Sequence, residues 1–137
     1  MSEIYQTAFL KLAARASGAG RLDNPDVTAT TRNPMCGDRI VMDLRLDGDR
    51  ITELGYEIRA CLVCQAAASV VGDTAVGRTL DALQVEKAAI ERFLKSNGQD
   101  PAPEGFAEFG AVAEHISRHT CVLLPFQAIE DATSTDG

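Results

Sequence analysis

Residues 39–58 read RIVMDLRLDGDRITELGYEI, and this stretch decides the fold. Apolar residues alternate with mostly polar ones over residues 40–46, which is the period-2 pattern of a half-buried strand. A turn at Asp47-Gly48-Asp49 and a second alternating run over residues 51–58 complete an antiparallel hairpin, with a slip in register expected near Gly55. The chain is therefore expected to contain a small antiparallel sheet.

Helical patterns lie on both sides of this hairpin. An amphipathic stripe predicts a first helix over residues 4–16, and the small apolar segment from Cys61 predicts a buried helix that ends near Gly72 or Gly77. Residues 21–34 show neither period and are expected to form a long loop. A short helix is expected from Leu80, with Thr79 as its N-cap, followed by a longer helix that ends at Asn97-Gly98. Another helix is expected over residues 106–116. A last helix should start near Cys121, with Pro125 in or near its first turn.

The size of the chain and its apolar runs restrict its class. The chain has 137 residues, which fits one domain of roughly 100–200 residues; we place it at residues 1–131 and expect a disordered polar tail at 132–137. No run of about 18 apolar residues is present to span a bilayer, and Met1-Ser2-Glu3 lacks the features of a signal peptide. We therefore expect a cytoplasmic protein without a membrane partner.

The charge balance argues against one class of partner. The net charge is -7 and the sequence pI is about 4.7. Binding to nucleic acid requires clustered Lys and Arg to neutralise phosphates, and no such cluster stands out in the sequence. No nucleic-acid partner is expected.

Three cysteines and one aspartate stand where elements are expected to begin or end. Gly37 lets the backbone turn so that Cys36 and Asp38 face one point. Cys61 follows 25 residues after Cys36, at the end of a hairpin that returns the chain to the same edge, and a helix start there lowers the pKa of its thiol. With Cys121, these residues form a plausible Cys₃Asp set for a tetrahedral divalent ion. The spacing alone leaves this interpretation and a role as small core residues equally open.

Three segments resemble, in order and separation, the three cysteine motifs of the IscU/SufU/NifU N-terminal family of iron-sulfur cluster assembly proteins. They are Asn-Pro-Met-Cys-Gly-Asp at residues 33–38, the alanine-rich helix start at 60–69, and Arg-His-Thr-Cys-Val-Leu-Leu at 118–124. The resemblance covers about residues 1–131. It implies an α+β fold in which a small three-stranded antiparallel sheet packs with about five helices and carries a metal site at one end.

The resemblance also implies a chemistry. By matching position, Cys36, Asp38, Cys61 and Cys121 bind Zn²⁺ or a [2Fe-2S] cluster. Family members accept persulfide sulfur from a cysteine desulfurase, and they build a cluster or pass sulfur to apo iron-sulfur proteins or other assembly factors. Catalysis would be at most that of a sulfurtransferase. Cys36 carries the persulfide in SufU-like members, whereas Cys121 is the alternative first acceptor in an IscU-like protein.

Features of the third motif favour one branch. The long spacing between Cys61 and Cys121 resembles the SufU branch, whose insertion would lie in residues 79–105. Thr120 stands where the IscU branch has a ligand histidine, and the chaperone-recruiting Leu-Pro-Pro-Val-Lys segment of that branch is missing. We therefore expect a zinc-dependent sulfur acceptor, with a [2Fe-2S] scaffold as the alternative.

Three further residues have open roles. Cys64 forms Cys-x-x-Cys with Cys61, and it either resolves a persulfide or replaces a ligand, or is a buried small residue, which we favour. His119 is either an alternate ligand or contact beside Cys121, or a surface residue. Arg118 is a candidate to orient Asp38 or to attract an anionic persulfide.

Overall fold

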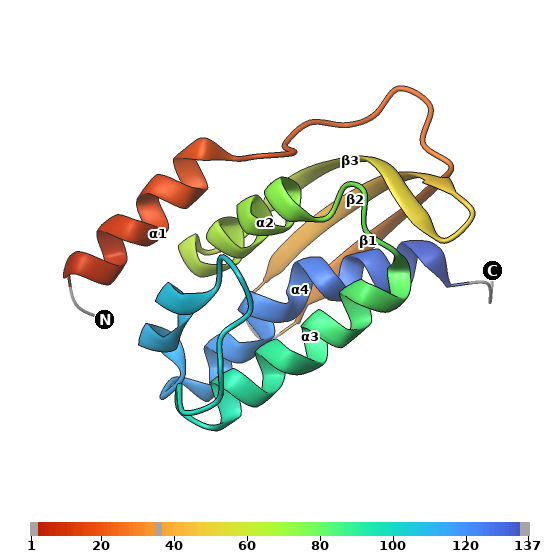
Figure 1. The fold of residues 1–137 in the computed structure, drawn as a ribbon. Helices are drawn as coiled ribbons and strands as arrows, with labels where there is room; N and C mark the ends of the chain where they lie inside the picture. Colours follow the sequence, from red (N-terminus) through yellow and green to blue (C-terminus); the bar gives the residue numbers. More distant parts are fainter. Residues whose placement is uncertain (1–2, 35–36, 135–137) are drawn as a thin grey trace.

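The computed structural model describes residues 3–34 and 37–134, which form an α+β domain (Figure 1). Its sheet has three antiparallel strands in the order β1-β2-β3. No helix in this part of the chain is both long and apolar enough to cross a membrane. The elements are α1 (Glu3–Arg15), β1 (Val27–Asn33), β2 (Asp38–Asp47), β3 (Arg50–Arg59), α2 (Leu62–Thr74), α3 (Leu80–Lys95), the 3₁₀ helix η1 (Ala107–Val112) and α4 (Ile116–Thr133).

The helices cover one face of the sheet in two layers (Figure 1). α4 packs on β1 and β2, α2 packs on β3, and the two helices also pack against each other. α1 lies against α2, and α3 lies against α4. This arrangement brings the start of α2 and the first half of α4 to the edge of the sheet where β2 begins and β3 ends.

The central strand shows why the sheet has two different faces. Ile40, Met42 and Leu44 are completely buried under the helices, while the intervening residues point to the opposite face. The predicted hairpin is confirmed. The expected slip near Gly55 is wrong, because the register shifts between Arg45 and Leu46 instead.

Gly55 has a different reason for being glycine. A Cβ at this position would lie 2.4 Å from the carbonyl oxygen of Gly20, which is closer than real Cβ contacts come. The segment after α1 therefore passes directly against β3 at this point. The glycine allows this close approach and is not a sign of a bulge.

The first strand corrects the expectation of a long loop over residues 21–34. Val27–Asn33 pairs with β2 along its whole length, and its residues alternate between partly buried and exposed before ending in buried Thr31 and Asn33. Threonine and arginine occupy the exposed positions of this edge strand, so few apolar residues mark the period in the sequence. The strand was predicted only by the family resemblance.

Two helical segments between α2 and the C-terminal helix also differ from expectation. α3 is one continuous helix rather than two, and the Thr79 hydroxyl caps it by accepting a hydrogen bond from the N–H of Ala82 at 3.1 Å. The expected helix over residues 106–116 is reduced to the 3₁₀ helix η1. Its phenylalanines still reach the core, since Phe106 and Phe109 are completely buried.

The last helix begins five residues earlier than expected. α4 starts at Ile116 instead of near Cys121, so Pro125 lies inside the helix rather than in its first turn. Proline cannot donate the helical hydrogen bond to the carbonyl four residues before it, here that of Cys121. Pro125 is one of the buried residues of α4. The helix also runs to Thr133, beyond the expected boundary at 131, and residues 135–137 of the expected tail lie outside the described residues.

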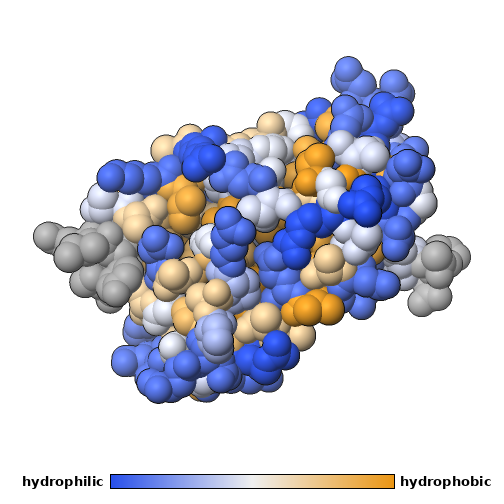
Figure 2. Space-filling view, in the orientation of Figure 1, coloured by the Kyte–Doolittle hydropathy of each residue, from blue (hydrophilic) through white to orange (hydrophobic). Residues whose placement is uncertain are grey.

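Exposed apolar residues are spread over several elements. Leu10, Val76, Val85 and Ile116 are each at least half exposed and lie on α1, after α2, on α3 and at the start of α4. Figure 2 shows apolar areas interrupted by polar side chains on the helix-bearing side. Among the described residues, this side therefore presents no single continuous apolar patch.

Candidate metal centre

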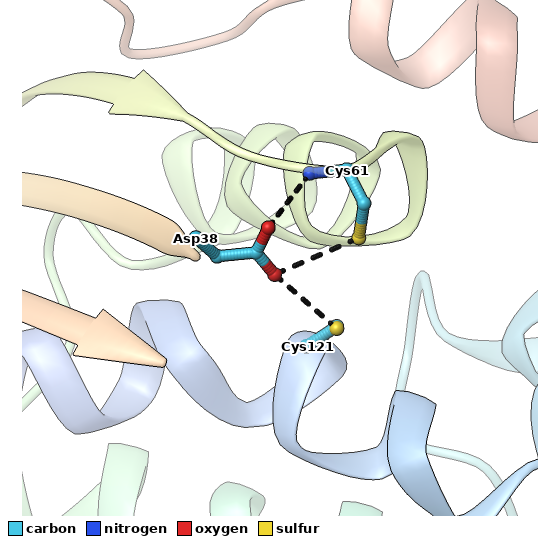
Figure 3. Close-up of side chains that lie close together, drawn as sticks. All are labelled: Asp38, Cys61 and Cys121. Carbon is cyan, nitrogen blue, oxygen red and sulfur yellow. Dashed lines mark hydrogen bonds between the residues drawn. The ribbon is translucent and has the colours of Figure 1, made fainter. Parts of the chain in front are cut away.

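Three side chains converge at the edge of the sheet where β2 begins (Figure 3). Asp38 is the first residue of β2, Cys61 is the N-cap of α2 directly after β3, and Cys121 lies in the second turn of α4. One ligand atom from each residue lies within 4.8 Å of the others. Segments far apart in the sequence thus place two thiols and one carboxylate around a single point.

The Asp38 carboxylate is the centre of this arrangement. Its Oδ1 accepts a hydrogen bond from the backbone N–H of Cys61 at 3.0 Å. Its Oδ2 accepts one from the Cys121 thiol at 3.3 Å and lies 3.7 Å from the Cys61 sulfur. The backbone of Cys61 therefore fixes the carboxylate so that its second oxygen faces both sulfurs.

The donor set and its spacing fit a tetrahedral metal ion. Thiolates and carboxylates are common zinc ligands, with Zn–S about 2.3 Å and Zn–O about 2.0 Å. In a tetrahedral site, these bond lengths put neighbouring sulfur and oxygen ligands about 3.5 Å apart. The two S–O separations at Asp38, 3.3 and 3.7 Å, lie on either side of this value.

The centre is buried on one side and open on the other. Cys121 is completely buried and Asp38 is 3% exposed, whereas Cys61 is half-buried. A cavity of about 370 Å³ reaches Cys61 and is lined by Arg118, His115, Gln6 of α1 and apolar side chains of α2 and η1. A molecule that approaches from this cavity meets Cys61 before Cys121.

The two thiols share one proton unequally. The pKa of Cys61 is lowered to about 6, chiefly because the Cys121 thiol donates a hydrogen bond to its sulfur, with help from the backbone N–H of Cys64 and the charge of Arg118. The pKa of Cys121 is raised because its thiol donates a hydrogen bond to Cys61, because burial disfavours the charged thiolate, and because the thiol also hydrogen-bonds to Asp38. Near neutral pH the ligand-free centre therefore carries a thiolate at Cys61 and a thiol at Cys121.

Asn33 is a residue of the centre that the sequence interpretation missed. It is 1% exposed, it pairs with Asp38 across the β1–β2 hairpin, and its side-chain amide donates a hydrogen bond to the Cys121 sulfur at 3.8 Å. Its carbonyl accepts a hydrogen bond from Gly37, whose φ of +72° is the left-handed conformation that glycine favours. Its place as the first residue of the 33–38 motif was the available signal.

The structure accounts differently for the remaining candidates. Cys36 lies outside the described residues. Cys64 is completely buried among core residues of α2 and does not belong to the group of three. The Nε2 of His119 lies 2.7 Å from the carbonyl oxygen of Ala113, so its ring faces the residue that follows η1. Arg118 borders the cavity at Cys61.

Comparison with solved structures supports the same fold. A NifU-like protein (N-terminal) from Brucella abortus superposes with a TM-score of 0.85 at 33% identity, over 94% of this chain and 91% of that one. The likeness thus extends over nearly the whole of both chains.

Comparison with protein sequences identifies the family. The bifunctional protein NifU/MnmA of Rubrobacter xylanophilus is 30% identical over the full chain, which spans only 26% of that protein's length. The zinc-dependent sulfurtransferase SufU of Bacillus subtilis is 26% identical over 82% of this chain and 78% of its own. A family model described as the NifU-like N terminal domain matches residues 4–120. This chain belongs to the family of NifU-like N-terminal domains.

Proposed function

We propose that this chain is an iron-sulfur cluster assembly protein that binds zinc and accepts persulfide sulfur from a cysteine desulfurase. The observation that carries the proposal is the convergence of Asp38, Cys61 and Cys121, whose ligand atoms lie within 4.8 Å of one another. Similarity to a protein named as a zinc-dependent sulfurtransferase supports the sulfur-transfer role. The acceptors are apo iron-sulfur proteins or other assembly factors in the cytoplasm.

Four residues would hold the ion. Asp38, Cys61 and Cys121 supply one oxygen and two sulfurs, and Cys36 supplies the fourth ligand that a closed tetrahedral site requires. Bound zinc would keep the thiols deprotonated at neutral pH. Asp38 is the ligand held least tightly, because a carboxylate is a harder donor than a thiolate. Asn33 supports the set through its hydrogen bond to the Cys121 sulfur.

Cys36 is the proposed sulfur acceptor. Its thiolate attacks the terminal sulfur of the donor persulfide, so that a new S–S bond forms on Cys36, the donor S–S bond breaks and the donor cysteine leaves as a thiolate. The alternative acceptor, Cys121, is completely buried. A sulfur carried on another protein cannot reach it unless the residues that cover it move, and this favours Cys36.

A [2Fe-2S] scaffold is the second candidate function. Thiolate ligands also suit iron in such clusters. In a two-iron cluster, however, the ligands are divided between two metal ions and lie further apart than the ligands of one ion. The close grouping around Asp38 Oδ2 therefore favours a mononuclear site.

The test is the composition of protein purified without air, for the wild type and for Asp38→Ala, with desulfurase activity measured in the presence of each. About one zinc per chain, no acid-labile sulfide and stimulation of the desulfurase by the wild type alone would support the proposal. Iron with matching sulfide would support the scaffold. Absence of metal from both proteins would overturn the four-ligand site.

A further inference from the structure

Three arginines lie side by side across the outer face of the sheet. Arg32 of β1 pairs with Arg39 of β2, which pairs in turn with Arg59 of β3. Their neighbours Ile40 and Ile58 face the helices, so the alternation of the strands turns these arginines to the opposite face. Directly opposed residues have Cβ atoms about 4.5–5.5 Å apart. We call these three residues the arginine row.

The arginine row differs from the rest of this face. Further along the sheet, Arg45 pairs with Glu53 at 3.2 Å, in register. Within the arginine row, only Arg39 forms an ion pair in the described part of the chain, with Glu57 at 3.8 Å. Arg32 borders a cavity beside β1 that Glu91 also lines. Arg32 and Arg59 are exposed, and neither forms an ion pair within residues 3–34 and 37–134.

The row costs stability in isolation. Like charges directly opposite each other on a sheet are destabilising, and the chain as a whole carries a net charge of -7, so no general excess of basic residues explains three arginines in one line. An external group with negative charge would relieve the repulsion. The arginine row is therefore better explained by binding of a negatively charged partner than by a contribution to the stability of the fold.

The row borders the candidate metal centre. Arg39 directly follows Asp38, Arg59 stands two residues before Cys61, and Arg32 precedes Asn33, which contacts the Cys121 sulfur. A partner seated on the arginine row thus lies at the edge of the sheet where the thiols are.

We propose that the arginine row is the docking surface for an acidic patch on the sulfur-donating protein, an inference that rests on the proposed function. Guanidinium groups bind carboxylates with two parallel hydrogen bonds, so three of them recognise a small group of Asp and Glu side chains. A nucleic acid is the less suitable occupant, since its many phosphates would also meet the overall negative charge of the chain.

The test compares two double variants with the same change in charge. Arg32→Gln/Arg59→Gln removes two exposed members of the row, and Arg45→Gln/Lys95→Gln removes two exposed charges elsewhere. Binding of each zinc-loaded protein to the organism's own cysteine desulfurase is measured at low and high salt. The row variant should bind about tenfold more weakly, with a shallower salt dependence, while the control stays within about twofold of the wild type.

The possible outcomes separate the docking surface from the proposed function. Equal binding by both double variants, or no binding of the wild type to the desulfurase, would overturn the docking surface. Binding of transfer RNA that only the row variant loses would also overturn it, in favour of a nucleic acid. Row-dependent binding without transfer of sulfur would leave docking intact and reject the proposed function, whereas sulfur transfer that does not depend on the row would do the reverse.

Discussion

At the scale of single residues, the two oxygens of Asp38 have different tasks. Oδ1 is held by the backbone N–H of Cys61, and Oδ2 faces the sulfurs of Cys61 and Cys121. Cys61 therefore positions Asp38 through its backbone N–H, and the thiol of Cys61 lies beside the same carboxylate. This hydrogen bond links the start of β2 to the β3–α2 connection.

Cys121 and Cys64 provide a matched pair for testing which thiols bind the metal. Both are completely buried, but only Cys121 belongs to the converging group. Loss of a group that merely contacts a ligand costs about 10–100-fold in metal affinity, so we expect Cys121→Ala to cost more. Cys64→Ala should leave zinc affinity unchanged. Competition with a chromophoric chelator measures both, and equal losses in the two variants would contradict the assignment.

The uneven sharing of a proton predicts how Cys61 reacts in the metal-free protein. A lowered pKa means that the thiolate, which is the nucleophile, is present at a lower pH than in an ordinary cysteine. Alkylation of Cys61 by iodoacetamide, followed by peptide mass spectrometry, should rise with a midpoint near the pKa of about 6. In Cys121→Ala the midpoint should move up toward about 8.5, the ordinary value. A midpoint that stays the same in both proteins would show that Cys121 does not stabilise the thiolate.

At the scale of elements, the sequence predicts the helices and strands whose apolar residues recur with a clear period, and it misses those whose residues do not. The β2–β3 hairpin and α2 were predicted from alternation and from small apolar residues, and both are confirmed. β1 was not, because its exposed positions carry Thr and Arg and its inward positions include polar Thr31 and Asn33. Burial of those polar residues depends on hydrogen bonds to α4 residues distant in sequence, such as that from Thr31 to Asp131 at 2.6 Å.

The candidate centre was predictable to a similar degree. Asp38, Cys61 and Cys121 were identified from the motifs, and the structure brings them together. Burial of Cys121 was one of the two alternatives left open, but its position in the second turn of α4 was not foreseen, because Pro125 indicated a helix start near Cys121. Asn33 was missed because its contact with Cys121 joins residues 88 positions apart.

Asp43 fastens the segment between α1 and β1 to the outer face of the sheet. Its carboxylate is completely buried and accepts hydrogen bonds from Arg21 at 2.6 and 3.1 Å, from the N–H of Leu22 at 3.1 Å and from Thr28 at 2.6 Å. Burial raises the pKa of Asp43, but the hydrogen bonds and the charge of Arg21 together outweigh it and hold the pKa below its usual value. The segment is therefore secured by a buried carboxylate and not by apolar packing alone.

Asp43→Asn should lower the free energy of unfolding by about 2–3 kcal/mol at neutral pH. A lowered folded-state pKa contributes stability above the unfolded value of about 3.9, and this contribution is lost as the pH falls through the folded value. The difference between variant and wild type should therefore shrink below about pH 4. Urea unfolding at both pH values measures it, with Asp47→Asn in the exposed turn as the control. A difference that is constant with pH would contradict the charged hydrogen-bond network.

At the scale of the whole molecule, the candidate ligands come from three elements that pack against one another: the sheet, α2 and α4. Asp38 belongs to the sheet, Cys61 to α2 and Cys121 to α4, whereas none of the three converging residues lies on α3. A ligand that binds only the folded state stabilises it by mass action, by about 4 kcal/mol at a thousandfold excess over its Kd. Bound zinc should therefore stabilise the contact between the sheet, α2 and α4.

Removal of zinc by a chelator should lower Tm and speed amide hydrogen exchange in a restricted set of segments. The start of β2, the first turn of α2 and the second turn of α4 should exchange faster, since their side chains lose the shared ion. α3 should change little, because it lies against α4 and supplies none of the three ligands. Cys121→Ala should show the chelated pattern with or without chelator. Faster exchange spread evenly over all helices would mean that the metal supports the whole fold and not this junction of the sheet, α2 and α4.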